Sequence, residues 1–311
     1  MALAHSFSLG SLRCHLLEAG WQRLDGGAMF GVVPKPLWSR KAVPDERNRI
    51  PLAMRCLLVE HPEGLVLVDT GLGNKEDPKF LDIYGVENQG NPGPTQLEDA
   101  LREVGFTPQD VRWVINTHLH FDHAGGNTLR ADKADKADGA GSSVRSSAHP
   151  PVRLAFANAT YVVQASELEF ARHTNERTRA SYLPHNFEPV AEARRWRLIE
   201  GDGEILPGIR SRLTPGHVPW HQSILLTNDG ETAVYLGDVV PTAAHLPLVY
   251  IMGYDLEPLR TLESKRALYR DAVAGAWWFL FEHDPAVARG RVVAEGAGVA
   301  LAKVERSPVP R

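Results

Sequence analysis

The segment His118–His123, with the sequence HLHFDH, carries the residues of this chain that are best suited to chemistry. It directly follows a short apolar run, VRWVIN, that predicts a β-strand. In an extended segment residues i and i+2 point to the same side, so His118 and His120 can share one cation. Asp122 and His123 lie past the strand end, where a turn can direct them toward a second cation. Imidazole and carboxylate ligands without cysteine suit Zn²⁺ or its first-row neighbours.

Two cations need more ligands, and three residues further along the chain lie in suitable places. His217 follows a predicted strand in the turn TPGH, Asp238 ends the predicted strand TAVYLGD, and His283 ends the predicted strand WWFLFE. Each of them alone is more typical of a capping or surface residue. The pattern H-x-H-x-D-H arises by chance in a chain of this composition roughly once in a thousand cases. Together with that pattern, the three residues indicate a metal centre.

The ordered motifs HLHFDH, TPGH, GD and EHD resemble those of the metallo-β-lactamase superfamily. HFDHAGGN and PGHVPWHQS resemble the branch that holds the acyl-homoserine lactonases and the methyl-parathion-type hydrolases. LGDVVPTAAHLPL together with FEHD is similar to a lactonase-like subgroup of that branch. The resemblance extends from about Gly26 to His283. It implies an α/β fold, the αββα four-layer sandwich, in which two mixed β-sheets are flanked by helices.

The resemblance also implies a dinuclear site with two Zn²⁺ per chain, where Mn²⁺, Co²⁺ or Fe²⁺ could take the place of zinc. It assigns His118, His120 and His217 to one metal, Asp122, His123 and His283 to the other, and Asp238 to a bridging position. Two Zn²⁺ with two carboxylates and five neutral imidazoles leave a net charge of +2, or +1 with one bridging hydroxide. Such a site favours an oxyanion that develops on a substrate.

The implied reaction is hydrolysis of a lactone or an ester. Metal binding lowers the pKa of water from about 15.7 to about 7, so a metal-bridging hydroxide is available to attack the carbonyl. Asp122 and Asp238 are the expected catalytic carboxylates, and Asp122 can take or relay the proton. No G-x-S-x-G nucleophile elbow occurs in the sequence. The leading prediction is therefore a quorum-quenching lactonase of the N-acyl-homoserine lactone type, or an esterase acting on related carboxylic esters.

One departure from the lactonase pattern keeps a second function open. Many acyl-homoserine lactonases carry a tyrosine three residues after the bridging aspartate, and Pro241 occupies that position here. Tyr182, Tyr250 or Tyr254 could supply a phenol from elsewhere in the chain. The alternative is a phosphotriesterase, or organophosphate hydrolase, on the same dinuclear site. A non-enzymatic scaffold is disfavoured because all seven ligand positions are filled.

Two residues are expected to support the ligands from behind. Asp69 closes the apolar strand LVLVD. The resemblance implies that it buttresses the metal loop, although a turn-forming aspartate is the plain alternative. His221 lies near the TPGH motif, and we expect it to be a hydrogen-bonding residue of the structure.

Four residues are expected to line the substrate cleft. Met29 and Phe30 lie in a glycine-flanked apolar cluster, and Trp38 follows a few residues later. The lactonase resemblance implies that this segment forms one wall of the cleft, whereas core packing is the alternative. His245, near Asp238 in the sequence, could also face the substrate.

The elements that must position these residues follow an alternating βα pattern from about Leu52. A capping box at Thr95–Glu98 opens a helix with apolar residues at helical spacing. We expect two mixed sheets with helices outside them. Residues 1–50 contain three prolines, with a fourth at Pro51, and are predicted to form an N-terminal arm over the active-site cleft. Residues 51–311 are predicted to form one domain, with a low-complexity surface insertion at 131–149.

The composition excludes several classes of protein. The chain has 311 residues, of which 43% are hydrophobic and 23% charged, and its net charge of −4 offers no basic surface for nucleic acid. Two cysteines suit a reducing compartment. No signal peptide or membrane-spanning segment is visible. We therefore expect a cytoplasmic enzyme whose partner is a small-molecule lactone or ester, with no nucleic-acid or membrane partner. The sequence leaves open whether the protein forms a homodimer.

Overall fold

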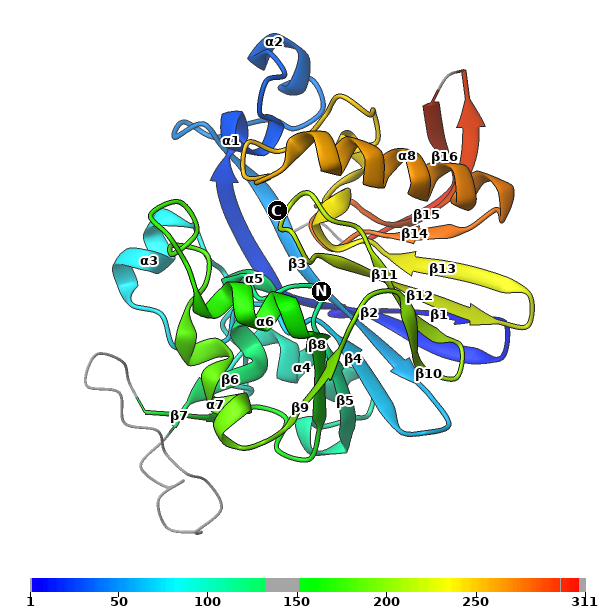
Figure 1. Ribbon diagram of the computed structural model, residues 1–311. Helices are drawn as coiled ribbons and strands as arrows, with labels where there is room; N and C mark the ends of the chain where they lie inside the picture. The colour runs from blue at the N-terminus through cyan, green and yellow to red at the C-terminus, as the bar shows by residue number, and fades with distance from the viewer. Residues whose placement is uncertain (1, 132–150, 297, 308–311) are drawn as a thin grey trace.

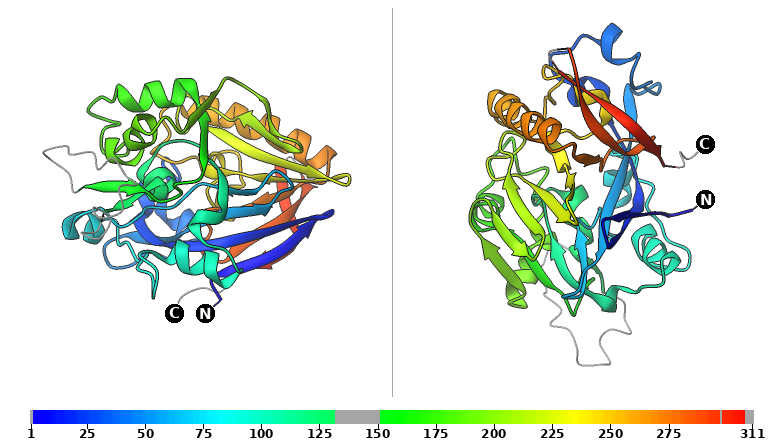
Figure 2. Two further views of the ribbon diagram at one scale, coloured as in Figure 1. Left: turned by 90° about the horizontal axis from the view of Figure 1, so that it is seen from below. Right: turned by 90° about the vertical axis from the view of Figure 1, so that its right-hand side faces the viewer.

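The computed structural model describes residues 2–131, 151–296 and 298–307 (Figure 1). In this part of the chain two seven-stranded mixed sheets pack face to face, and helices cover their outer faces. The two views of Figure 2 show helix α8 (Pro258–Ala274) on one side of the strands and helix α4 (Gln96–Glu103) on the other. The predicted αββα sandwich is confirmed.

The first sheet has the strand order β1-β2-β3-β4-β5-β8-β9. Its first four strands pair in antiparallel fashion, and β4, β5, β8 and β9 run parallel. The strands span Ala4–Leu9 (β1), Leu12–Asp25 (β2), Arg49–Glu60 (β3), Leu65–Val68 (β4), Val111–Ile115 (β5), Thr160–Gln164 (β8) and Trp196–Ile199 (β9).

The second sheet has its seven strands in chain order, and all neighbours are antiparallel except the parallel pair β13 and β14. The strands span Gly203–Leu206 (β10), Ile209–Leu213 (β11), Gln222–Asn228 (β12), Glu231–Tyr235 (β13), Trp278–Leu280 (β14), Val287–Glu295 (β15) and Gly298–Arg306 (β16). A small separate ribbon pairs β6 (Thr128–Arg130) with β7 (Val152–Leu154).

Short helices fill the connections. The other α-helices are α1 (Gly26–Phe30), α2 (Lys35–Trp38), α3 (Pro78–Ile83), α5 (Phe121–Ala124), α6 (Ala165–Arg172) and α7 (Glu188–Glu192). The 3₁₀ turns are η1 (Pro108–Asp110), η2 (Gly125–Asn127), η4 (Pro184–Asn186), η5 (Gly237–Val239) and η6 (Ala243–His245).

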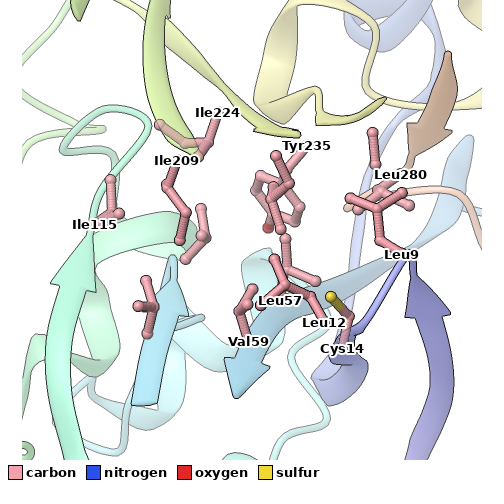
Figure 3. Close-up of a cluster of buried hydrophobic side chains, with 14 of the residues drawn as sticks. Leu9, Leu12, Cys14, Leu57, Val59, Ile115, Ile209, Ile224, Tyr235 and Leu280 are labelled. Carbon is pink, nitrogen blue, oxygen red and sulfur yellow. The ribbon is translucent and has the colours of Figure 1, made fainter. Parts of the chain in front are cut away.

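The main core lies between the two sheets, because side chains alternate along each strand. In β3, Leu57 and Val59 point to the inter-sheet core shown in Figure 3, where they meet residues such as Ile224 of the second sheet. Cys56 and Leu58 point the other way and pack beneath α4. Both faces of this strand are therefore buried, which explains its nearly continuous apolar sequence.

The predicted helix at Thr95 is confirmed as α4. The backbone N–H of Thr95 donates to the Glu98 carboxylate at 2.8 Å, as the capping box predicts. Leu97, Ala100 and Leu101 form its buried face. This amphipathic pattern fixes the helix against the outer face of the first sheet.

The N-terminal arm differs from the prediction. Residues 4–25 form β1 and β2 of the first sheet, and β2 pairs with β3 from Arg13↔Glu60 to Asp25↔Arg49. The physical reason is that β2, with apolar residues such as Leu16 and Leu17, is buried along most of its length. Only residues 26–48, with the short helices α1 and α2, leave the sheet and run toward the site.

The carboxyl ends of several strands meet at one edge of the sandwich. Asp69 follows β4 and His118 follows its parallel neighbour β5, while Asp238 and His283 follow the parallel pair β13 and β14. Parallel strands end at the same edge, which is where open α/β sheets bind ligands. The fold therefore brings the predicted site residues of both sheets together.

No helix in the described part of the chain is long and apolar enough to cross a membrane.

The predicted low-complexity insertion at 131–149 lies, apart from Ala131, outside the described residues. Its flanks are held together, since β6 pairs with β7 and the Ala131 N–H donates to the Pro151 carbonyl at 2.8 Å.

We predict that replacing residues 132–147 with a short Gly-Ser link leaves the free energy of unfolding within about 1 kcal/mol of the wild type, because loop-closure entropy depends weakly on length. Urea denaturation tests this. A loss of several kcal/mol would show that the replaced segment packs against the domain.

Candidate metal centre

Seven side chains predicted as ligands converge at the edge where the two sheets meet. Their donor atoms form two groups in which all atoms lie within 4.8 Å of one another: His118, His120, His217 and Asp238, and Asp122, His123 and His283. The groups divide the residues as the sequence predicts, and all but the partly exposed His120 are buried.

In the first group the donor atoms face a common point. His217 Nε2 lies 3.0 Å from His120 Nδ1 and 3.0 Å from Asp238 Oδ2. His118 Nε2 is buried and has no hydrogen-bond partner among the described residues. The rings of His118 and His120 lie 4.5 Å apart, on one side of the segment as the i, i+2 spacing predicts. Burial lowers the pKa of both imidazoles well below the usual value, so they are neutral and suited to bind a cation.

The second group is equally close. His283 Nε2 lies 3.2 Å from His123 Nε2 and 3.7 Å from Asp122 Oδ2. His123 Nε2 lies 3.8 Å from Asp122 Oδ1. Asp122 and His123 lie on α5, whose short turn carries them out of the line of β5. Two imidazoles and one carboxylate suit Zn²⁺ or a related first-row cation.

Asp238 joins the two groups. Its Oδ2 lies 3.0 Å from His217 Nε2, and its Oδ1 lies 3.1 Å from His283 Nε2. Each carboxylate oxygen therefore faces a different group. This is the arrangement that a bridging ligand needs.

Asp69 holds the second group from behind. Its Oδ2 lies 3.1 Å from His123 Nδ1, and its carboxylate accepts from the Thr117 N–H at 2.8 Å and the Thr117 hydroxyl at 2.7 Å. With Nδ1–H occupied, His123 Nε2 points into the site. The loop after Asp69 packs tightly on the ligand loop: a Cβ at Gly126 would lie 2.0 Å from the Thr70 carbonyl oxygen, so only glycine fits there.

His221 positions Asp238, in line with its predicted structural role. Its Nε2 accepts from the Asp238 N–H at 3.0 Å, and its Nδ1 pairs with the Thr214 hydroxyl at 2.8 Å. Burial lowers the pKa of His221 to about 3. The ring is therefore neutral at ordinary pH and keeps the lone pair that the Asp238 N–H needs.

Three supporting residues escape sequence analysis. Asp255 lies 3.0 Å from His217 Nδ1, Gln22 donates its amide N–H to Asp122 Oδ2, and Glu282 lies 3.1 Å from His123 Nδ1. Glu282 had a weak signal, since it precedes His283 in EHD. Burial raises its pKa to about 7. Gln22 and Asp255 lie in segments with no metal-ligand pattern, so only the tertiary fold reveals them.

A cavity of about 410 Å³ opens over the site. Five of the predicted ligands line it: His120, Asp122, His217, Asp238 and His283. Its other walls are largely apolar and include Leu24, Ala28, Met29, Leu52, Phe121, Met252 and Leu256. The reactive groups thus lie at one end of an apolar pocket, which is the usual form of a small-molecule site.

Of the four residues expected to line the cleft, only Met29 does so. The predictions for Phe30, Trp38 and His245 are wrong, because these residues pack behind the wall. The Phe30 ring stacks on Trp38 at 5.4 Å and on His245 at 4.5 Å. His245 Nε2 donates to the Met29 carbonyl at 2.8 Å, and its Nδ1 pairs with the Thr242 hydroxyl at 2.8 Å. The core-packing alternative therefore holds for these three.

Of the three tyrosines considered as sources of a phenol, only one lines the cavity. The Tyr182 hydroxyl donates to Glu167 at 2.9 Å, and Tyr250 packs edge-on against Phe30. Tyr254 lines the cavity, and so does Tyr84, which sequence analysis did not consider. Burial raises the pKa of Tyr254 to about 12 and also raises that of Tyr84. Both phenols are therefore neutral hydrogen-bond donors at pH 7.

Comparison with known proteins places this site in a family. Residues 51–277 match the profile described as the Metallo-beta-lactamase superfamily. The chain belongs to this superfamily. Its resemblance to that family, inferred from the motifs alone, is confirmed.

Individual relatives point to one branch. An N-acyl homoserine lactonase of Bacillus sp. is 33% identical over 190 residues, which cover 60% of this chain and 62% of that protein. A probable metal-dependent hydrolase from Staphylococcus aureus superposes with a TM-score of 0.82 at 30% identity, covering 97% of this chain and 100% of the other. A dizinc quorum-quenching lactonase with a bound product has the same fold, with a TM-score of 0.75 at 18% identity over 97% and 98% of the two chains. The match with the curated Bacillus lactonase thus spans less than two thirds of that protein's length.

Asp238 and Asp69 should respond differently to truncation. We predict that Asp238→Ala lowers the metal content below two per chain and abolishes hydrolysis, because both groups lose a ligand. Asp69→Ala keeps every ligand and should weaken metal affinity by about 10–100-fold. Elemental analysis and metal titration measure both effects. Two tightly bound metals in Asp238→Ala would contradict the bridging position.

His245 should make stability depend on pH. Burial lowers its pKa from 6.5 to about 4 in the folded chain. Between these values only the unfolded chain binds the proton, so stability falls as pH falls from 6.5 to 4. The loss attributable to His245 is about 3 kcal/mol, from about 1.4 kcal/mol per pKa unit.

Urea denaturation of the metal-free protein at pH 7 and pH 4.5 tests this against His245→Gln. The metal ligands titrate in both proteins, so their contribution cancels in the comparison. An equal loss of stability in the two proteins would contradict the prediction.

Proposed function

We propose that this protein is a dizinc hydrolase that opens lactones of the N-acyl-homoserine type or cleaves related carboxylic esters. The observation that carries the proposal is Asp238, whose two oxygens face two groups of buried ligands at the end of an apolar cavity. The 33% identity to an N-acyl homoserine lactonase supports the choice of substrate class.

The donor set favours zinc, because five imidazoles and two carboxylates without cysteine or backbone ligands suit a borderline first-row cation. His118, His120 and His217 would hold one cation, and Asp122, His123 and His283 the other. Two such cations supply a hydroxide nucleophile at neutral pH and a positive charge for the carbonyl oxygen.

Asp122 is placed to handle the proton. The Gln22 amide holds its Oδ2, while Oδ1 lies 3.8 Å from His123 Nε2. Asp122 also lines the cavity. In the proposed reaction its carboxylate accepts the nucleophile's proton and passes it to the leaving alkoxide oxygen, which completes ring opening.

Tyr254 and Tyr84 are the phenols that would take the role of the tyrosine replaced by Pro241. Both line the cavity, and both are protonated at neutral pH. A phenol O–H directed at the substrate carbonyl stabilises the oxygen as it becomes anionic. The replacement of either by phenylalanine removes that donor and leaves the ring in place.

The apolar wall fits an acyl tail. Met29 and Leu24 come from the N-terminal segment, and Met252 and Leu256 from the loop before α8. Methionine adapts to flexible alkyl chains. Each methylene buried there contributes up to about 0.8 kcal/mol.

A hydrolysis panel tests the proposed substrate class. Zinc-loaded protein is assayed on homoserine lactones with tails of several lengths, on aryl esters and on paraoxon-type triesters. We expect the highest kcat/KM for a lactone or ester and loss of all activity on chelation. Triester cleavage without lactone or ester cleavage would replace the proposal with the phosphotriesterase alternative.

Met29 should set the preference for tail length. We predict that kcat/KM rises with tail length in the wild type and that Met29→Ala flattens this rise, while a tail-less lactone is cleaved as before. Val33→Ala is the matched control, since Val33 lies in the same apolar cluster but does not line the cavity. A Met29→Ala profile parallel to that of the wild type would contradict the wall assignment.

We also propose that the protein is cytoplasmic and that it has no nucleic-acid or membrane partner. Whether it forms a homodimer is left as an open prediction.

A further inference from the structure

A buried arginine of the first sheet holds the segment that carries His283. Strand β14 ends at Leu280, and the chain then leaves the second sheet. Arg55, in β3, donates from Nη1 to the Phe281 carbonyl at 2.7 Å and from Nη2 to the Asp284 carbonyl at 3.1 Å. The two carbonyls lie on either side of His283.

The backbone of β3 binds the two carbonyls that lie between those of Phe281 and Asp284. The Arg55 N–H donates to Glu282 O at 3.2 Å, and the Ala53 N–H donates to His283 O at 3.1 Å. Four consecutive carbonyls, from 281 to 284, therefore accept hydrogen bonds from two residues of β3. Arg55 alone supplies three of these bonds.

The same contact orients the ligand ring. His283 Nδ1 donates to the Ala53 carbonyl at 2.7 Å, which leaves Nε2 directed to Asp238 Oδ1 at 3.1 Å. Hydrogen bonds to β3 of the first sheet thus fix the position of this imidazole, although His283 follows a strand of the second sheet.

Only an arginine can make this contact. Arg55 is fully buried, and its Nε donates to Glu18 Oε1 at 2.7 Å while the two terminal nitrogens reach the carbonyls. The planar fork of guanidinium serves three acceptors in fixed directions, which a lysine ammonium on a flexible stem does not. Glu18 is its counterion, and the Ser307 hydroxyl donates to the same Glu18 oxygen.

We propose that Arg55, with Glu18 as its counterion, is a positioning residue that fixes the second metal position by holding the His283 segment against β3. The inference rests on the dinuclear centre of the proposed function. It assigns Arg55 a role at a site that its side chain does not touch.

Two variants separate this role from a general loss of stability. Arg55→Lys keeps a charge beside Glu18 but cannot reach both carbonyls, and Arg55→Met removes charge and fork together. The matched control is Arg289→Met, which breaks the partly buried ion pair between Arg289 and Glu305 in the second sheet. Metal-free proteins are titrated with Zn²⁺ and with Co²⁺ against a competing chelator, which gives the affinity of each of the two metals.

We expect both Arg55 variants to bind the first metal within about threefold of the wild type and the second about 10–100-fold more weakly, the usual range for outer contacts of a metal site. Arg289→Met should keep both affinities. If Arg55→Met does not fold, Arg55→Lys alone decides.

Wild-type affinity for the second metal in folded Arg55→Lys would overturn the inference and leave the proposed function standing. An equal weakening of both metals in the Arg55 variants and in Arg289→Met would also overturn it. A wild type that binds only one metal would overturn both the inference and the proposed function.

Discussion

Five imidazoles and two carboxylates lie together at the edge where the two sheets meet, and all of them except the partly exposed His120 are buried. Burial keeps His118 and His120 neutral, and His118 Nε2 finds no hydrogen-bond donor among the described residues. A buried polar atom without a partner is costly. A cation held by each group would remove that cost, and Asp238 directs one oxygen to each group. A metal centre would therefore satisfy this cluster of polar groups.

The two sheets share the work of supplying the ligands. One sheet supplies the HLHFDH segment, and the other supplies His217, Asp238 and His283. Ligands on both sides of an interface need the sheets at a defined separation, and the inter-sheet core provides most of it. At the site itself, β3 of the first sheet positions the His283 segment directly, because Arg55 donates hydrogen bonds to it. Around the ligands, Asp69, Asp255 and the Ala53 carbonyl hold the Nδ1 atoms of His123, His217 and His283, so that Nε2 of each ring faces the site.

Much of this was predictable from the sequence because the ligands occupy a regular pattern. The i, i+2 spacing of His118 and His120 and the positions of the other candidates at strand ends depend on local structure, and local structure follows from apolar periodicity. The same reasoning predicted α4 and the two mixed sheets. It could not place Gln22 or Asp255, because their contacts join segments that are far apart in the chain.

The errors have a similar origin. An apolar cluster flanked by glycines is compatible with a cleft wall and with a core, and sequence alone does not distinguish them. Met29 faces the cavity while Phe30, its neighbour, stacks against His245 behind it. The arm over residues 1–50 was predicted from its prolines, all of which lie between residues 34 and 44, whereas residues 12–25 form a largely buried strand of the first sheet. Treating residues 1–50 as one segment concealed the difference between the strand-forming residues 12–25 and the proline-containing residues that follow.

The most direct test of the account is the distance between the two metals. X-ray absorption spectroscopy of the fully zinc-loaded protein measures it through the zinc–zinc scattering. Because Asp238 directs one oxygen to each ligand group, we expect two zinc ions about 3.5–4 Å apart, the range of two-metal sites. A spectrum with nitrogen and oxygen neighbours but no zinc scatterer at that distance would contradict the bridged dinuclear centre.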